Sequence, residues 1–497
     1  MQFWTAEEQP PHLVCAVPEV AAPWETYHKY YPGGSIIVEH LQMLETLFGN
    51  FDLVVDNPYY NLVWQFAENT SMNPEQIEVP MLLVAGWFDH NTLWDLVLID
   101  TLASSSPASV KDQHKILVGP WIHGGLGATD QGDLSFPEAQ HANDELALEF
   151  FDYHIRGIDN GWEERQRYTY FQMGEGEWKQ SEVWPPAGIN WLPWFLHDSG
   201  EILPNVPSPG AGPYLEFSYD PEDPSPTIGG KTLHSDLLQG PYDQSEEVES
   251  RNDVLAFSTP VLTEELYVQG KIRVKLFVSS DRPDTDFALR LTEVYPDGKS
   301  ILLGEAIQRM RFREGYTAND EVFMTPGEVY PIDLEFEDLA ITFQEGNQLR
   351  LIVSSSNYPR YNRNMNTGGE MHPGGNYDTL VNPLIASNRV YSSSQYPSML
   401  ELPIGQQTSA DNERTAKAPF LLYPNPVGPE LTIEGPEFCQ VELFDLHGRL
   451  VRSYELRTEK ETFDLSGLAE GVYVVRVYSC LNQNSQNFRI FRIKSPR

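Results

Sequence analysis

Cysteine, basic side chains and long apolar runs are all scarce in this sequence. Its three cysteines, Cys15, Cys439 and Cys480, are too few and too scattered for a disulfide framework or a zinc site, although a Cys439–Cys480 pair stays open. No apolar run reaches the roughly 18 residues that a membrane-spanning helix needs. Lys and Arg total 33 against 72 Asp and Glu, a net charge of −39. This charge argues against a nucleic-acid partner, because phosphate binding depends on Lys and Arg.

A chain of 497 residues allows about three domains, and the first of these has the pattern of an α/β sheet. Apolar runs at 81–84 and 116–118 have the composition of buried parallel strands. Amphipathic spacing at 92–102 predicts a helix between them, which completes one right-handed crossover unit. Further elements expected here are a buried strand within 12–22, helices within 24–75 and a helix at 142–155.

Beyond about residue 165 the helical spacing fades and short alternating runs take over. Runs at 271–278, 288–294 and 348–353 alternate apolar and polar residues, and joints rich in Pro and Gly separate such runs. This pattern is typical of a β-sandwich or jelly roll. Residues 406–418 are polar and without periodicity, which predicts a linker. Alternation returns in 419–497, which we expect to be an independent small β-sandwich.

Two polar side chains follow the two predicted parallel strands. Gly86 would allow a turn that places Asp89 after the first strand, and Gly119-Pro120 would do the same for His123 after the second. In open α/β sheets, catalytic groups gather at this edge. A single Asp or His on such a loop is more often a solvated or capping residue. The pair, in the order Asp then His, instead indicates two members of an α/β-hydrolase triad.

The residues around this pair resemble the family of X-Pro dipeptidyl-peptidases, cocaine esterases and α-amino-acid ester hydrolases. Its triad acid lies in a motif matched by residues 86–89 (GWFD), and its triad histidine in one matched by residues 119–123 (GPWIH). The resemblance implies catalytic roles for Asp89 and His123, and makes Trp87 and Trp121 candidate substrate contacts. It also extends to segments 150–161, 194–202, 219–230, 279–300 and 354–364, the last four of which are similar to the family's jelly roll.

The nucleophile of that family has no match in the sequence. Family members carry it in a G-x-S-x-G turn, and no such pattern occurs in the 497 residues. By the family's spacing the turn would precede Met1, so we expect an N-terminally truncated hydrolase that is inactive as given. Ser35, in Gly33-Gly34-Ser35, is the alternative nucleophile, but its surroundings lack the strand–turn–helix pattern.

Other acidic residues are weaker candidates for binding. The resemblance implies that residues 24–75 form a helical cap over the pocket, and that Glu19, Glu25 or Glu39 could bind a substrate amine; ordinary surface carboxylates are the simpler interpretation. Asp281, Asp284 and Asp286 could suggest calcium, but their loop lacks the alternating ligands and glycine of a dedicated site. We therefore expect no metal and no cofactor.

The last module resembles the type IX secretion sorting domain of Bacteroidetes. The matching segments are 421–427, 441–451 and 463–477. The resemblance implies the type IX machinery as a partner and a secreted or cell-surface location.

Together these observations predict a partial α/β-hydrolase sheet with a helical cap (1–165, cap 24–75), a jelly roll (166–405), a linker (406–418) and a sorting domain (419–497). The expected function is a secreted serine hydrolase with a Ser-Asp-His mechanism. Its substrate could be an X-Pro peptide, an amino-acid ester or another acyl ester. The alternative is a secreted saccharide- or peptide-binding protein with a vestigial hydrolase half.

Overall fold

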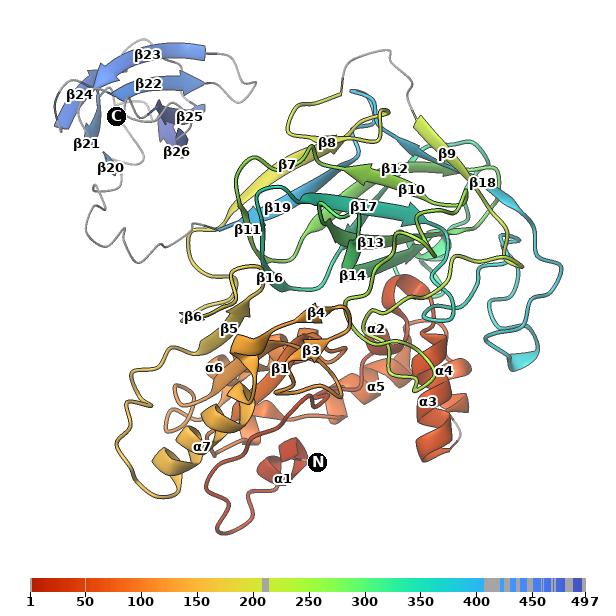
Figure 1. The fold of residues 1–497 in the computed structure, drawn as a ribbon, viewed down its shortest axis with the longest axis horizontal. Coiled ribbons are helices and arrows are strands. Elements are labelled where there is room, and N and C mark those ends of the chain that lie inside the picture. The colour runs from red at the N-terminus through yellow and green to blue at the C-terminus, as the bar shows by residue number, and fades with distance from the viewer. Residues whose placement is uncertain are drawn as a thin grey trace. The chain divides into compact units, whose positions relative to one another are not determined.

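The computed structural model divides the chain into two compact units, Met1–Gln406 and Gln407–Arg497 (Figure 1). The structure describes residues 2–49, 51–207, 214–405, 421–423, 430–434, 439–444, 450–456, 458, 460–465, 468, 471–478 and 486–493. The expected linker 406–418 and Cys480 lie outside these residues, so the linker and the Cys439–Cys480 pair stay predictions. No helix among the described residues is long and apolar enough to cross a membrane.

The first unit contains a four-stranded sheet in the order β1-β2-β5-β6. Strands β1 (Leu82–Phe88) and β2 (Lys115–Ile122) are parallel, as expected, and β5 (Tyr168–Gln172) runs parallel to β2. Strand β6 (Glu177–Ser181) closes the sheet antiparallel to β5. The sheet therefore continues past the boundary expected at residue 165. Every residue of β1 is buried, which explains its unbroken apolar character.

The helices predicted around this sheet are present. Helix α6 (Thr92–Ser105) connects β1 to β2, and α7 (Ala142–His154) follows β2. A short helix, α1 (Gln2–Glu7), precedes them, and the two-stranded ladder of β3 (Asp130–Gln131) and β4 (Leu134–Ser135) lies between β2 and α7. The buried strand expected within 12–22 is not regular: only two isolated parallel bridges, Ala16 to Met81 and Glu19 to Val84, join this segment to the region of β1.

The two glycines expected to turn the chain lie inside strands instead. Gly86 and Gly119 are paired neighbours in β1 and β2. A Cβ atom on Gly86 would lie 2.2 Å from the Trp121 carbonyl oxygen, and one on Gly119 would lie 2.4 Å from the Trp121 ring. Both positions thus require glycine because Trp121 comes so close, and the strands extend to the residues directly before Asp89 and His123.

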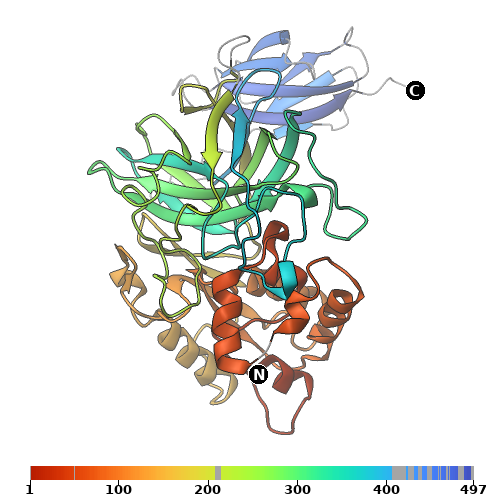
Figure 2. The same cartoon turned by 90° about the vertical axis from the view of Figure 1, so that its right-hand side faces the viewer.

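A group of helices, which we call the cap, lies between α1 and β1 in the sequence. Its members are α2 (Tyr27–Tyr30), α3 (Val38–Phe48), α4 (Asp52–Val55) and α5 (Leu62–Thr70). Tyr27, Tyr31 and Trp64 form part of a separate hydrophobic cluster inside the cap. Figure 2 shows these helices below the sheets formed by residues 190–404, which we call the β domain. The Val38 N–H donates to the Arg360 carbonyl, and the Asn362 N–H to the Ile36 carbonyl, so the backbone of the cap is bonded to that domain.

The remainder of the first unit, the β domain, consists of two sheets. One has the order β10-β17-β13-β14, and the other is a nine-stranded sheet built on β16-β11-β19-β12-β18-β9. The runs predicted as strands are β12 (Arg273–Ser280), β13 (Asp286–Val294) and β17 (Gln348–Ser354). The other strands are β7 (Asn190–Leu196), β8 (Ile202–Leu203), β9 (Tyr214–Tyr219), β10 (Leu255–Ser258), β11 (Leu266–Gly270), β14 (Ser300–Arg309), β15 (Tyr330–Glu335), β16 (Leu339–Phe343), β18 (Ala386–Tyr391) and β19 (Met399–Ile404).

One hydrophobic core joins these sheets to the α/β sheet. Leu276 of β12 and Leu289 of β13 belong to the same buried cluster as Val84 of β1 and Leu117 of β2. A parallel bridge between Met173, just after β5, and Ile341 of β16 links the sheets directly. Burial of this continuous apolar surface stabilises the α/β part and the β domain as one body.

The second unit contains two small sheets. One pairs β20 (Leu421–Tyr423), β21 (Glu430–Glu434) and β24 (Lys460–Asp464). The other has the order β23-β22-β25-β26, formed by β22 (Cys439–Phe444), β23 (Leu450–Leu456), β25 (Gly471–Tyr478) and β26 (Gln486–Ile493). Leu431, Ile433, Val441 and Leu443 are buried, so side chains from both sheets make its interior.

Candidate active site

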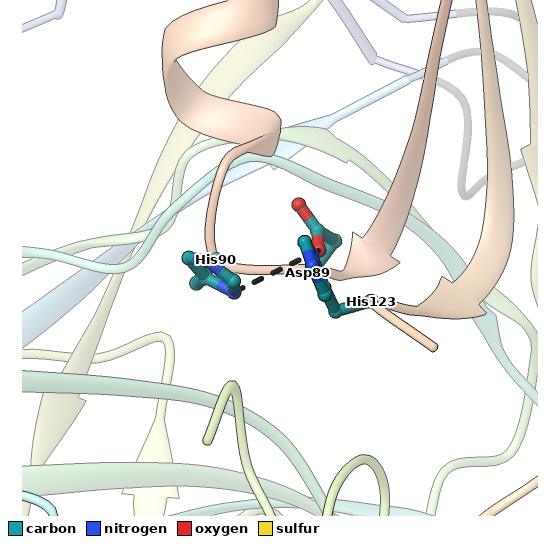
Figure 3. A group of neighbouring side chains, drawn as sticks. All are labelled: Asp89, His90 and His123. Atoms are coloured by element: carbon teal, nitrogen blue, oxygen red, sulfur yellow. Dashed lines mark hydrogen bonds and ion pairs between the residues drawn. The ribbon is translucent and has the colours of Figure 1, made fainter. Parts of the chain in front are cut away.

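Asp89 and His123 meet at the carboxyl edge of the parallel strands. Asp89 directly follows β1 and His123 directly follows β2. The His123 Nδ1–H donates to Asp89 Oδ2 over 2.6 Å. Figure 3 shows the two side chains close to the ends of the two strands. The Asp89 carboxylate is fully buried, whereas 33% of the His123 side chain is exposed. A bond to Nδ1 fixes the imidazole tautomer and leaves Nε2 as the acceptor, which is what a general base requires.

Asp89 is held by the chain that follows it. The backbone N–H of Asn91 donates to Asp89 Oδ1 over 2.7 Å, so both carboxylate oxygens are bonded. The Thr92 hydroxyl donates to the Gly86 carbonyl, and α6 starts at this threonine. The turn between strand and helix therefore fixes the carboxylate before any partner is added.

Gln131 holds the segment that carries His123, a role that the sequence did not reveal. Its side chain is completely buried. Its Oε1 accepts the Ile122 N–H over 2.9 Å, and its Nε2 donates to the carbonyls of Gly125 and Ala128. One amide thus satisfies three backbone groups of the turn after β2, and it acts as a positioning residue for the imidazole.

Two further histidines extend the site, and the sequence reasoning missed both. The His90 ring lies 4.6 Å from the His123 ring and 4.9 Å from the His40 ring, centroid to centroid. Burial lowers the pKa of His40 to about 3 and that of His90 well below its usual value, so both are neutral near pH 7. His90 could have been noticed because it directly follows Asp89; nothing in the sequence connects His40, on α3 of the cap, to this edge.

Asp95 is a second buried carboxyl near Asp89. It lies in the first turn of α6 and is 2% exposed. Burial, with the Asp89 carboxylate adding to it, raises the pKa of Asp95 well above its usual value. The neutral form of Asp95 is therefore favoured beside the Asp89 carboxylate.

A cavity of about 320 Å³ is lined by His40 and His90, whereas His123 and Asp89 are not among its lining residues. Its walls come from the cap, from the start of α6 and from the β domain, and both charge signs are present. The lining includes Lys29, His40, His90, Glu305, Arg360 and Tyr361. The volume is that of a small-molecule pocket with a mixed polar lining.

The two candidate substrate contacts, Trp87 and Trp121, lie in the core. Trp87 is 1% exposed and its indole N–H donates to the Phe171 carbonyl over 2.8 Å. Trp121 is fully buried and its ring lies 5.9 Å from that of Trp178. Both rings pack in the core. Trp87 also lines a small cavity of about 30 Å³ together with Arg360 and Tyr361. A role of either ring as a substrate contact stays a prediction.

The structure also places the weaker candidates. Ser35 is buried, and its hydroxyl donates to Asn362 Oδ1 over 3.1 Å. Glu39 is 1% exposed and bonded to Arg360 Nη1 at 2.7 Å, so its charge is already paired. Glu25 pairs with Lys29 at 3.0 Å, and Glu19 Oε1 lies 3.4 Å from Asn143 Nδ2. None of these three glutamates lines the 320 Å³ cavity.

The acidic residues considered for calcium are bonded to cationic side chains instead. Asp284 accepts from Arg311 Nε over 2.7 Å, and Asp286 accepts from Arg309 Nη2 over 2.8 Å. Both carboxylates and both guanidinium groups are buried. Asp281, the third candidate, accepts the Ser387 N–H.

Two segments of the chain match known domain families. Residues 160–401 match the family described as the X-Pro dipeptidyl-peptidase C-terminal non-catalytic domain. The chain carries this domain. Residues 421–490 match the secretion system C-terminal sorting domain, which indicates a secreted or cell-surface protein.

A curated relative covers both the X-Pro dipeptidyl-peptidase C-terminal domain and the α/β part. The chain is 33% identical over 367 residues to cocaine esterase of Rhodococcus sp. (strain MB1 Bresler), which is 71% of this chain and 61% of that protein. The chain thus spans less than two thirds of its relative's length. The match confirms that the chain resembles the cocaine esterase family, as its two motifs predict.

Solved structures show the same fold at lower identity. An aminopeptidase from a marine sediment archaeon (Thaumarchaeota) has a TM-score of 0.67 at 22% identity, over 80% of this chain and 73% of that one. An α-amino-acid ester hydrolase has a TM-score of 0.66 at 22% identity, over 81% and 75%. The predicted order, an α/β sheet followed by a β-rich domain, agrees with these folds.

Proposed function

We propose that this chain is the larger part of a secreted serine hydrolase that cleaves ester or amide bonds. The observation that carries the proposal is the 2.6 Å hydrogen bond from His123 Nδ1 to the buried Asp89 carboxylate, at the edge where β1 and β2 end. A buried carboxylate that orients a partly exposed imidazole is the acid and base arrangement of a Ser-His-Asp triad.

In the proposed mechanism the proton moves through His123. Nε2 accepts the proton of a serine hydroxyl as the serine oxygen bonds to the substrate's carbonyl carbon. The imidazolium then returns the proton to the leaving alcohol or amine, and an acyl-serine remains. In the second half, water loses a proton to Nε2 as its oxygen bonds to the acyl carbon. The bond from that carbon to the serine oxygen then breaks, the imidazolium returns the proton to the serine oxygen, and the acid is released. Asp89 stabilises the imidazolium throughout and itself stays unprotonated.

The serine of this triad is proposed to lie outside the 497 residues. No G-x-S-x-G pattern occurs in them, and the hydroxyl of Ser35 is bonded to Asn362. Of the groups that would hold the oxyanion, one backbone N–H would belong to the same turn as the serine and the other to an earlier loop. We therefore propose that the 497-residue chain has no hydrolase activity by itself.

The substrate is proposed to be a small acyl ester, amino-acid ester or X-Pro peptide. Cocaine esterase and the α-amino-acid ester hydrolase are named for esters, and an aminopeptidase shares the fold. The cavity of about 320 Å³ suits an acyl group of this size. The β domain, proposed to be a jelly roll, supplies part of its wall, and the small second unit is proposed to be a β-sandwich read by the type IX secretion machinery of a Bacteroidetes host.

A fluorophosphonate probe tests the proposal, because it bonds covalently to an activated serine. The 497-residue chain should not be labelled and should not hydrolyse p-nitrophenyl esters or p-nitroanilides. A longer chain that includes the preceding coding sequence should be labelled once, and His123→Ala in it should abolish turnover. Stoichiometric labelling of the 497-residue chain would mean that an internal serine is the nucleophile. A longer chain that neither labels nor turns over would favour the alternative, a binding protein.

A further inference from the structure

Three ligand atoms for a metal ion converge where Asp89 follows β1. Asp89 Oδ2, one His90 ring nitrogen and one His123 ring nitrogen lie within 4.8 Å of one another. Oδ2 is 2.6 Å from His123 Nδ1 and 3.7 Å from His90 Nδ1. Figure 3 shows both imidazoles beside the same carboxylate. A hydrolase triad uses only Asp89 and His123, so His90 has no part in the proposed mechanism.

His90 Nδ1 is the unusual member of this group. Its side chain is 10% exposed, and within the described part of the chain Nδ1 is a buried atom without a hydrogen-bond partner. The ring is held between those of His40 and His123, so its position is set by packing. Buried polar atoms are normally paired, and an imidazole nitrogen aimed toward a carboxylate is a good ligand for a divalent transition metal.

We propose that Asp89 Oδ2, His90 Nδ1 and His123 Nδ1 together bind a divalent transition-metal ion of the Zn²⁺ type. Bond lengths of about 2.0–2.2 Å in a tetrahedral site place ligand atoms about 3.3–3.6 Å apart. The two separations from Asp89 Oδ2, 2.6 Å and 3.7 Å, lie on either side of that range, so rotations of the two rings are needed to bring the atoms to it. Asp89 Oδ1 keeps its bond from the Asn91 N–H and orients the carboxylate. The partly exposed His123 leaves a fourth position to water.

Metal binding would change the state of His123 without removing a proton from the protein. The metal takes the Nδ1 lone pair, and the proton that Nδ1 donated to Asp89 moves to Nε2. Nε2 is then a donor and cannot accept a serine proton. The binding claim stands on the geometry alone; this inhibitory consequence rests on the proposed function, and the test of binding does not use activity.

Co²⁺ absorption spectroscopy on the 497-residue chain, followed by displacement with Zn²⁺, tests the site directly. We expect one Co²⁺ per chain with the intense visible bands of tetrahedral coordination, lost on adding one equivalent of Zn²⁺. His90→Asn replaces the ring nitrogen by a neutral amide, which is a poor ligand for Zn²⁺, and should weaken Zn²⁺ affinity by more than about 100-fold, since outer-shell changes alone cost 10–100-fold. His123→Asn should do the same.

The matched control is His12→Asn. His12 is exposed and has a φ of 80°, which asparagine tolerates, so this variant should bind Zn²⁺ as the parent does. Circular dichroism melting checks that each variant is folded. The proposal is overturned if the folded parent shows no tetrahedral Co²⁺ spectrum, or if folded His90→Asn binds Zn²⁺ as tightly as the parent, which would indicate adventitious surface histidines.

Discussion

Two buried carboxylates in this chain have opposite surroundings. Asp89, at the edge of the α/β sheet, is bonded to an imidazole that is one third exposed. Asp286, at the start of β13, is bonded to Arg309, which is 3% exposed, and the two are direct partners across β13 and β14. Both carboxylates are completely enclosed by protein, so burial alone does not distinguish them.

The difference lies in the partner. Arginine keeps its charge at every ordinary pH and has no free position to offer a substrate, so the Asp286–Arg309 pair can only hold the structure together. Histidine can gain and lose a proton near neutral pH, and the exposed side of His123 can reach a reacting group. A buried acid is a catalytic candidate when its partner is titratable and accessible.

The largest expected effect is on catalytic activity, which should depend on Asp89 and not on Asp286. In a chain that carries the nucleophile, Asp89→Asn should lower kcat/KM by about 10⁴-fold, because the imidazole loses its correct tautomer. Its melting temperature should change much less than that of Asp286→Asn, which leaves Arg309 buried and unpaired. Steady-state kinetics well below both melting temperatures are the measurement. Equal losses of activity in the two variants would contradict the distinction.

The next effect concerns stability. Arg309→Met removes the partner of Asp286 and should lower the free energy of unfolding of the first unit by about 3–5 kcal/mol, measured by urea denaturation. The double variant Asp286→Leu/Arg309→Met removes both charges and should recover much of this loss. If the double variant is as unstable as the single one, the loss comes from packing rather than from an unpaired charge.

A smaller effect comes from the other end of β2. His114 directly precedes this strand, is fully buried and lies 3.1 Å from the Ser106 hydroxyl. Burial lowers the pKa of His114 to about 4. The folded-state pKa of His114 lies below the unfolded value of about 6.5. The free energy of unfolding is therefore unaffected by this group above about pH 6.5, and it falls as the pH is lowered from there toward 4, because the unfolded chain takes up the proton first.

At about pH 5, His114 should have lowered the free energy of unfolding by about 2 kcal/mol relative to neutral pH. The asparagine in His114→Asn cannot be protonated. Between neutral pH and about pH 5, the free energy of unfolding of this variant should therefore drop less than that of the parent, and the difference should be about 2 kcal/mol. The comparison of the two pH-dependent differences cancels the cost of the substitution itself. Identical acid sensitivity in parent and variant would show that His114 is not buried as a neutral group.

The smallest expected effect is that of removing the second unit. Residues 407–497 form a compact unit of their own, so their deletion should leave the melting temperature of the first unit unchanged. In the native host the deletion should stop secretion. A clear drop in melting temperature would mean that the first unit depends on the second for folding, and continued secretion would refute the sorting role.

The sequence predicted the contact between Asp89 and His123 well because its signals are local. Asp89 and His123 each follow an apolar run and a glycine-containing motif, and the parallel pairing of those runs brings them together. The glycines were misinterpreted as turns because the constraint on them is the approach of Trp121, which is a contact in three dimensions. A glycine that permits a turn and one that makes room for a neighbour look alike in sequence.

Contacts between distant segments could not be predicted. Asp286 faces Arg309 because β13 and β14 pair with a register shift between Leu291 and Thr292, and nothing in the sequence marks that shift. The contact of His40 with His90 needs the cap to be placed against the sheet. Gln131 is an ordinary polar residue in sequence, and only the fold shows that it bonds three backbone groups beside His123.

Nitrogen NMR of isotope-labelled histidine in the 497-residue chain tests the central claim most directly, since it reports which ring nitrogen carries the proton. The resonance of His123 is identified by its loss in His123→Ala. In metal-free protein near neutral pH we predict the Nδ1–H tautomer, with a strongly deshielded Nδ1 proton, and its disappearance in Asp89→Asn. A His123 that is mainly the Nε2–H tautomer, or one that is unaffected by Asp89→Asn, would contradict the account.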